Sequence, residues 1–197
     1  MAVPRGTTDR PVILYDTTLR DGAQTVGISL SLHDKVIIAA ALDRLKIDYI
    51  EGGWPGSNPK DARFFEMLRS FEFKNTRMTA FSSTCRPGLS PGNDENIQAL
   101  IKTKMKAVTL FGKSWDLHAR EILGVTLEEN LSMIEETVAY LKAVGREVIY
   151  DAEHFFDGHA SDPDYALACL RTAADAGAAV LCLCDTRGGS LPEAITL

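Results

Sequence analysis

The chain carries the stretch Tyr15-Asp16-Thr17-Thr18-Leu19-Arg20-Asp21-Gly22-Ala23-Gln24 close to its N-terminus. This stretch follows Val12-Ile13-Leu14, a short apolar run that predicts a buried strand. Two carboxylates, an arginine, two threonines and a glutamine therefore lie around a single glycine, Gly22, directly after a strand. Such a cluster is more typical of the rim of an active site than of an ordinary turn.

Outward from this stretch, strand-like and helix-like patterns alternate to the end of the chain. Alternation of this kind predicts a parallel sheet covered by helices. The helix that opens at Ser31 is predicted to have a capping box with Asp34 and an apolar face that includes Val36, Ile37 and Leu45. The predicted strands cover residues 12–14, 48–51, 78–81, 106–111, 147–150 and 179–184, and the predicted helices cover residues 31–46, 60–71, 94–102, 126–145 and 162–177, with a further helix starting near residue 190.

Two α/β architectures fit this alternation, an open doubly wound sheet and a (β/α)₈ TIM barrel. An open sheet concentrates its ligand contacts near one switch point, whereas a barrel gathers polar residues from many strand ends. All six predicted strands end in polar or glycine-rich clusters, which favours the barrel. Since a barrel needs eight strands, we expect a barrel truncated after six βα units. We expect residues 1–10 to be an N-terminal tail and residues 11–197 to be the N-terminal three-quarters of the barrel domain.

Composition narrows the class of protein. The 197 residues include 45% hydrophobic and 24% charged residues, as in an ordinary soluble globular protein. A net charge of −6 and the lack of any Lys/Arg run argue against nucleic acid as a partner. No apolar run reaches about 18 residues, so we expect no membrane span. We interpret the cysteines as reduced thiols, three or more of them in the core, and expect a cytoplasmic protein; they are Cys85, Cys169, Cys182 and Cys184.

Several motifs resemble one enzyme family. Asp16–Gly22 resembles the signature of the metal-dependent Claisen-type enzymes that use a TIM barrel, which include isopropylmalate, homocitrate and citramalate synthases and hydroxymethylglutaryl-CoA lyases. Residues 51–61, 111–118 and 151–158 are similar to the citramalate synthase branch of that family. The resemblance extends over residues 11–197 and corresponds to the N-terminal part of such an enzyme.

The chain departs from the family pattern in two ways. Arg187 stands where the family usually has an asparagine after the sixth strand. The family's His-x-His metal motif follows the seventh strand, which would lie beyond Leu197. The histidines of this chain contain no such pair; they are His33, His118, His154 and His159.

The resemblance implies a reaction and a divalent metal ion. The family adds acetyl-CoA to a 2-keto acid and then hydrolyses the thioester, while a metal ion polarises the keto carbonyl. By resemblance, Asp21 is a ligand of Mg²⁺ or Mn²⁺, with the other protein ligands expected beyond Leu197. Arg20 is expected to stabilise the developing negative charge on the keto-acid oxygen, with a structural ion pair as its alternative role.

Other residues receive roles in the same way. Glu153 matches the catalytic glutamate of the family, and proton movement at the acetyl methyl group needs a positioned acid or base. Asp151 and Thr186 are expected to bind the keto acid, and Gln24 either does so or braces its loop. Glu51 either supports the site or forms a structural ion pair, with the second role slightly favoured.

The function expected from this resemblance is the condensation of acetyl-CoA with pyruvate to (R)-citramalate and CoA, in isoleucine biosynthesis. The alternatives are an isopropylmalate synthase acting on 2-ketoisovalerate in leucine biosynthesis, a carbon–carbon lyase, and an inactive barrel fragment. We expect the full-length protein to be a homodimer and the 197-residue chain alone to be inactive.

Overall fold

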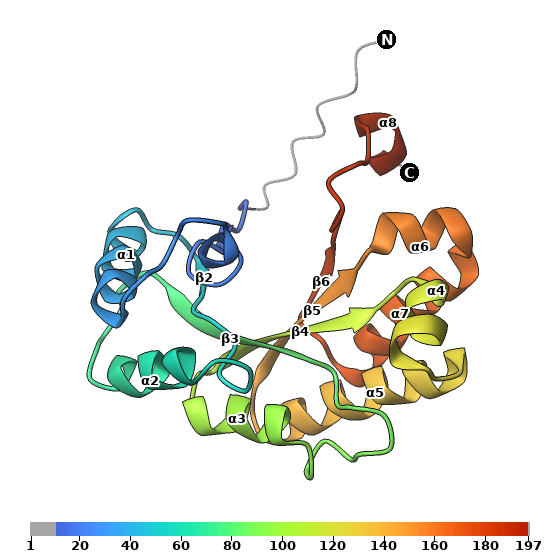
Figure 1. Cartoon of the computed structure of the whole chain (residues 1–197), viewed down its shortest axis with the longest axis horizontal. Helices are drawn as coiled ribbons and strands as arrows, with labels where there is room; N and C mark the ends of the chain where they lie inside the picture. Colours follow the sequence, from blue (N-terminus) through green and yellow to red (C-terminus); the bar gives the residue numbers. More distant parts are fainter. Residues whose placement is uncertain (1–10, 197) are drawn as a thin grey trace.

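The computed structural model describes residues 11–196, and the predicted tail of residues 1–10 lies outside this range. Six parallel strands pair in chain order within one sheet. The sheet curls as it proceeds from the first strand to the last (Figure 1). The predicted α/β fold, six βα units of a TIM barrel, is confirmed. The strands are β1 (Tyr15–Asp16), β2 (Tyr49–Glu51), β3 (Arg77–Ser83), β4 (Ala107–Lys113), β5 (Glu147–Glu153) and β6 (Val180–Leu183).

The main helices lie along the outer, convex side of the curved sheet (Figure 1). They are α1 (Leu32–Arg44), α2 (Pro59–Leu68), α3 (Glu95–Thr103), α5 (Leu127–Ala143) and α7 (Pro163–Ala176). Short helical segments also follow several strands. The sequence predicts only the last of them, near residue 190. These segments are η1 (Gly22–Gln24), α4 (Asp116–His118), η2 (Ala119–Leu123), α6 (Phe155–Ser161) and α8 (Pro192–Ile195). None of the helices formed by residues 11–196 is long and apolar enough to cross a membrane.

The first strand lies later in the chain than predicted. Val12, Ile13 and Leu14 were expected to be buried, but they are 83%, 60% and 49% exposed. The first residue pair of the two strands is Tyr15 opposite Tyr49, and the Leu14 carbonyl accepts the Tyr49 N–H at 3.0 Å. The stretch Tyr15–Gln24 therefore includes the strand itself as well as the loop that follows it.

The buried face of α1 also differs from the prediction. Ser31 caps the helix in the predicted box with Asp34, but Ile37 is 51% and Leu45 is 71% exposed. Lys35 is buried in their place, where its ammonium group forms an ion pair with Asp61 of α2 and donates to the Gly52 carbonyl at 2.9 Å. A buried cation must keep such partners, so this pair determines how α1 is turned against the sheet.

Asp61 also accepts a hydrogen bond from the backbone of the β2–α2 loop. Its Oδ2 accepts the Trp54 N–H at 2.9 Å. Gly53 has a φ of +144°, and a Cβ placed on it would come within 2.4 Å of the Asp61 carboxyl carbon. A glycine is therefore required here for close packing of the loop against α2.

Replacement of Lys35 by methionine is expected to lower the free energy of unfolding by about 3–5 kcal/mol, because Asp61 would remain buried without its counter-charge. Chemical denaturation would measure the change. Lys102→Met is the matched control, since Lys102 is exposed on α3, and it should change stability by less than about 0.5 kcal/mol. Equal effects of the two variants would contradict a structural role for the pair.

Candidate active site

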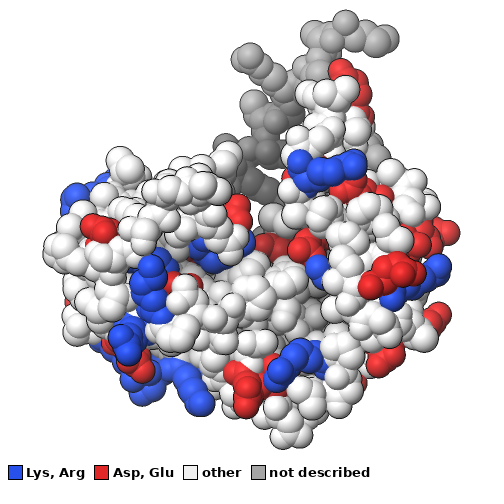
Figure 2. Space-filling model, in the orientation of Figure 1, with Lys and Arg blue, Asp and Glu red and all other residues white. Residues whose placement is uncertain are grey.

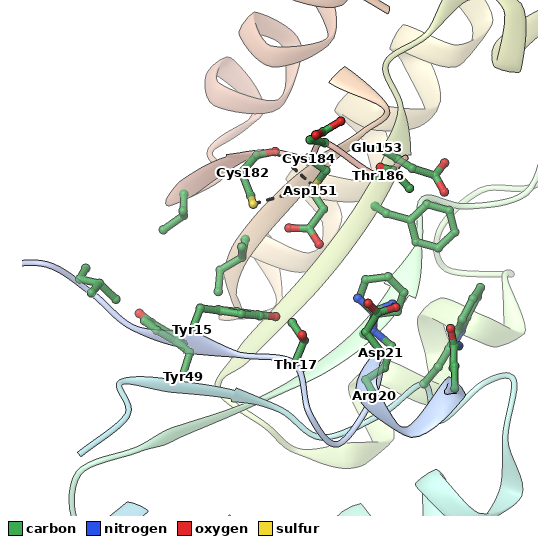
Figure 3. A pocket seen from close by; sticks show the side chains of 18 residues that line it. Tyr15, Thr17, Arg20, Asp21, Tyr49, Asp151, Glu153, Cys182, Cys184 and Thr186 are labelled. Atoms are coloured by element: carbon green, nitrogen blue, oxygen red, sulfur yellow. Dashed lines mark hydrogen bonds and ion pairs between the residues drawn. The ribbon is translucent and has the colours of Figure 1, made fainter. Parts of the chain in front are cut away.

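A cavity of about 810 Å³ runs along the concave side of the sheet, from Tyr49 and Val180 at the starts of β2 and β6 to residues at and beyond the carboxyl ends of the strands. In the space-filling view the molecule is hollowed between its two sides, and acidic and basic side chains lie along the hollow (Figure 2). This volume lies within the usual range for small-molecule sites. All six residues predicted for the site line this cavity (Figure 3); they are Arg20, Asp21, Gln24, Asp151, Glu153 and Thr186.

Arg20 is held by a buried carboxylate. Its Nε donates to Glu51, which is fully buried at the end of β2, and its Nη1 donates to Asp21 at 3.1 Å. The guanidinium carbon lies 3.9 Å from the centre of the Phe81 ring. Desolvation raises the pKa of Glu51, while the neighbouring Arg20 charge opposes that rise. The ion pair predicted for Glu51 is thus confirmed, and it holds Arg20 at the cavity.

A row of hydroxyl groups continues from Glu51 across the strands. The Tyr15 hydroxyl donates to Glu51 Oε2 at 2.6 Å and lies 2.7 Å from the Thr109 hydroxyl, which in turn lies 2.8 Å from that of Thr79. Because each hydroxyl has one proton, Thr79 donates to Thr109 and Thr109 donates to Tyr15. Burial and the Glu51 charge raise the pKa of Tyr15, so this donor stays protonated.

Asp21 suits a hard divalent cation as a single ligand. Its side chain is 63% exposed, and one oxygen accepts from Arg20 while the other has no hydrogen-bond partner among residues 11–196. A carboxylate oxygen is a ligand that Mg²⁺ and Mn²⁺ prefer. Within the described range, however, Asp21 belongs to no group of three or more clustered ligands. This part of the chain therefore offers one donor of such a site.

Glu153 and Asp151 lie on β5 with different surroundings. Glu153 forms an ion pair with Lys113 at the end of β4, a partner that the sequence did not predict. Asp151 has no ion pair with any residue in the described part of the chain, and its side-chain hydrogen-bond partner there is the Cys182 thiol. Burial, followed by the Cys182 and Glu51 charges, raises the pKa of Asp151 to about 8, although Arg20 acts in the opposite direction. A carboxyl with this pKa is largely protonated at neutral pH and can donate a hydrogen bond.

Two of the four cysteines line the cavity. Cys85 and Cys169 are buried, but Cys182 on β6 is exposed and Cys184, directly after β6, is half-buried, so the expectation of three or more core cysteines is wrong. Their sulfurs are 3.9 Å apart and form no disulfide. The Cys184 S–H donates to Cys182, which lowers the pKa of Cys182 and raises that of Cys184. Both side chains lie on the concave side of the sheet and form part of the cavity wall.

The loop after β6 is tied to α6. The Thr186 hydroxyl oxygen accepts the His154 N–H at 2.9 Å, which leaves its own O–H free to donate. Asp157 accepts from Arg187 at 2.7 Å and lies 2.9 Å from His154 Nδ1. Arg187, which stands where the family usually has an asparagine, therefore has Asp157 as its ion-pair partner.

His118 and His154 pack edge-to-face against each other outside the cavity lining, with ring centres 4.7 Å apart. Burial, and then the charges of His154 and Lys113, lower the pKa of His118.

An aromatic wall closes one side of the cavity. Phe81 and Phe111 stack with ring centres 5.3 Å apart, and Trp54 packs edge-on against both of them. The sequence did not single out these three rings as site residues. The only signal was that each stands at or just after the end of a predicted strand.

Replacement of Asp151 by asparagine should change how stability depends on pH. The pKa of the Asp151 carboxyl is about 8 in the folded state and 3.8 in the unfolded chain. Its contribution to the free energy of unfolding is therefore fully present at pH values below about 4 and is lost as the pH rises to about 8, because the unfolded chain gives up the proton first. Relative to Asp151→Asn, the unfolding free energy of the original chain should therefore fall by on the order of 1.4 kcal/mol per pH unit over that window.

Denaturant titrations at a series of pH values would measure this difference. Asp175→Asn, at an exposed position on α7, is the control and should give a profile parallel to the original chain. A parallel profile for Asp151→Asn as well would refute the burial of this carboxyl in its uncharged form.

Comparisons with known proteins agree over nearly the whole chain. Residues 11–196 match the family described as HMGL-like. The chain is 55% identical over 184 residues to (R)-citramalate synthase of Aquifex aeolicus, which covers 93% of this chain and 35% of that protein. It is 56% identical to (R)-citramalate synthase of Synechocystis, covering 93% of this chain and 34% of the relative. The chain thus spans about a third of the length of these relatives.

More distant proteins complete the comparison. The 2-isopropylmalate synthase of Saccharolobus solfataricus is 33% identical, with 93% of this chain and 45% of that protein covered. Among solved structures, the HMG-CoA lyase of Bacillus subtilis superposes with a TM-score of 0.74 at 16% identity, covering 93% of this chain and 61% of that one. At this identity the likeness is one of fold.

Proposed function

This chain belongs to the HMGL-like family, and on that premise we propose that the protein condenses acetyl-CoA with a 2-keto acid. The keto acid is pyruvate, and the products are (R)-citramalate and CoA, a step that serves isoleucine biosynthesis. The observation that carries this proposal is the identity of 55–56% with citramalate synthases, against 33% with a 2-isopropylmalate synthase. Residues 11–197 then form the N-terminal three-quarters of the catalytic barrel.

The keto acid binds between the β1 loop and the ends of β5 and β6. A divalent cation such as Mg²⁺ or Mn²⁺, held by Asp21 and by ligands outside the described residues, supplies Lewis-acid polarisation of the keto carbonyl when bound. Thr186 has a free O–H for the substrate carboxylate, and Gln24 offers an amide at the same cavity.

Arg20 stabilises the oxygen on which negative charge develops. Its guanidinium has five N–H donors, of which one is used by Glu51 and one by Asp21. The donors that remain can bind the keto-acid oxygen while Glu51 holds the group in place. A donor that is oriented before the reaction needs no reorganisation as the charge forms.

The two carboxyls on β5 have separate tasks. Glu153, paired with Lys113, serves as the acid/base at the acetyl methyl group. Asp151 retains its proton near neutral pH and donates a hydrogen bond to the keto acid. Their different surroundings make two roles possible on one strand.

Two wider expectations belong to this proposal and await tests of their own. The intact enzyme is a homodimer, and it works in the cytoplasm. Sedimentation of the purified protein would test the first, and fractionation of cells that produce it would test the second.

Release of free CoA thiol by the intact protein tests the activity. With Mg²⁺ or Mn²⁺ present, pyruvate should give a kcat/KM at least about tenfold above that for 2-ketoisovalerate or 2-ketoglutarate, a difference of about 1.4 kcal/mol. A preference for 2-ketoisovalerate would replace this proposal by isopropylmalate synthesis. Absence of keto-acid-dependent release would reject condensation altogether.

Arg20→Lys should lower kcat/KM by about 10²–10³-fold, because an ammonium group cannot keep both Glu51 and the substrate oxygen as partners. Arg171→Lys, at an exposed position on α7, should leave the value unchanged. An active Arg20→Lys enzyme would exclude the role assigned to this guanidinium.

Glu153→Gln should lower kcat by about 10²–10⁴-fold with little change in the KM for pyruvate, because the amide keeps the shape but cannot move a proton. The matched control is Glu135→Gln, on the exposed side of α5. If KM rose while kcat was retained, Glu153 would instead be a binding residue.

A further inference from the structure

A third group of potential ligands lies on the cavity wall, on the β5–β6 side. Cys182 of β6 and Cys184, the first residue after the strand, are two positions apart, and both sulfurs lie on the cavity face (Figure 3). The parallel register sets Asp151 of β5 beside Cys182. One carboxylate oxygen and the two sulfurs all lie within 4.8 Å of one another.

The spacing of the two sulfurs matches a tetrahedral metal site. Bonds of about 2.3 Å from zinc to two thiolates at the tetrahedral angle separate the sulfurs by about 3.8 Å. The sulfurs of Cys182 and Cys184 are 3.9 Å apart. The two sulfurs of a disulfide are about 2.05 Å apart. The observed separation is therefore that of two ligands of one ion, and not that of two bonded sulfurs.

The three groups are also available. Within residues 11–196, Asp151 takes part in no ion pair, and the side chains of Asp151 and Cys182 are hydrogen-bonded only within the group formed by these two residues and Cys184. Coordination would therefore displace no other protein partner. The cavity itself leaves room for a water molecule or another small ligand at the fourth position of the ion.

From this arrangement we propose that Cys182, Cys184 and Asp151 bind a thiophilic divalent cation, with Zn²⁺ as the chemical type. This site is separate from the hard-cation position at Asp21. Thiolates prefer zinc-like ions, whereas Mg²⁺ and Mn²⁺ prefer oxygen ligands. A soft ion at Cys182 and Cys184 and a hard ion at Asp21 can therefore bind to the same cavity at different positions. The two thiols and the protonated Asp151 carboxyl release their protons to solvent when the ion binds, and the thiolates and the carboxylate become its ligands.

Occupation of this site would engage Asp151. In the proposed function, on which this step rests, Asp151 donates a hydrogen bond to the keto acid. The metal ion and the keto acid would therefore compete for Asp151. Binding of the ion can be measured without any turnover, so failure of the metal site and failure of the proposed activity are separable.

The test uses the intact protein, with thiols kept reduced by a phosphine and Mg²⁺ at saturation, titrated with Co²⁺ as a spectroscopic probe. A thiolate-to-Co²⁺ charge-transfer band should appear with one ion per chain and should disappear on addition of Zn²⁺. Cys182→Ala and Cys184→Ala should each abolish the band and weaken Zn²⁺ binding by at least about 100-fold. Asp151→Asn should retain a band but weaken binding by at least about tenfold.

Cys85→Ala is the matched control, because Cys85 is a buried thiol away from the cavity, and its band should be unchanged. Circular dichroism would verify that each variant is folded, and Cys182→Ser and Cys184→Ser serve as replacements if an alanine variant is not. An absent band in the original protein, or a band that persists in the Cys182→Ala/Cys184→Ala double variant, would overturn the proposal.

Discussion

The fully buried carboxylate of Glu51 is the constraint on which the rest of the site depends. A carboxylate without exposure to water needs charged or hydrogen-bonding partners, and both of its partners come from the opening stretch. Tyr15 donates to one oxygen and Arg20 to the other. The loop after β1 is thereby drawn onto the end of β2, and Asp21 is carried to the cavity with it.

Parallel register provides the second half of the site. Since side chains alternate along a strand, Asp151 and Glu153 share one face of β5, and Cys182 and Cys184 share the same face of β6. The pairing of β5 with β6 places these two faces side by side, with Asp151 next to Cys182. One curved sheet thus collects oxygen donors from its first and fifth strands and sulfur donors from its sixth, which is why one cavity can suit two kinds of metal ion.

Patterns that depend on near neighbours in the sequence were predicted well. The order of strands and helices, the capping box at Ser31 and the convergence of the six site residues on the strand ends all agree with the structure. Predictions failed where a charged group is buried or a strand has no partner. Lys35 takes the buried face of α1 that Ile37 was expected to share, and Val12 to Leu14 are exposed just before the first residue pair of β1 and β2.

The sequence alone determined the α/β alternation, the family resemblance and the residue types at each strand end, because these follow from periodicity and from residues adjacent in the chain. Only the tertiary structure decided which side chains are partners. Arg20 with Glu51, Lys113 with Glu153, and Asp151 beside Cys182 join residues that are 31, 40 and 31 positions apart. The free energy of such a contact exists only once the strands are aligned and water is excluded, so no local pattern can encode it.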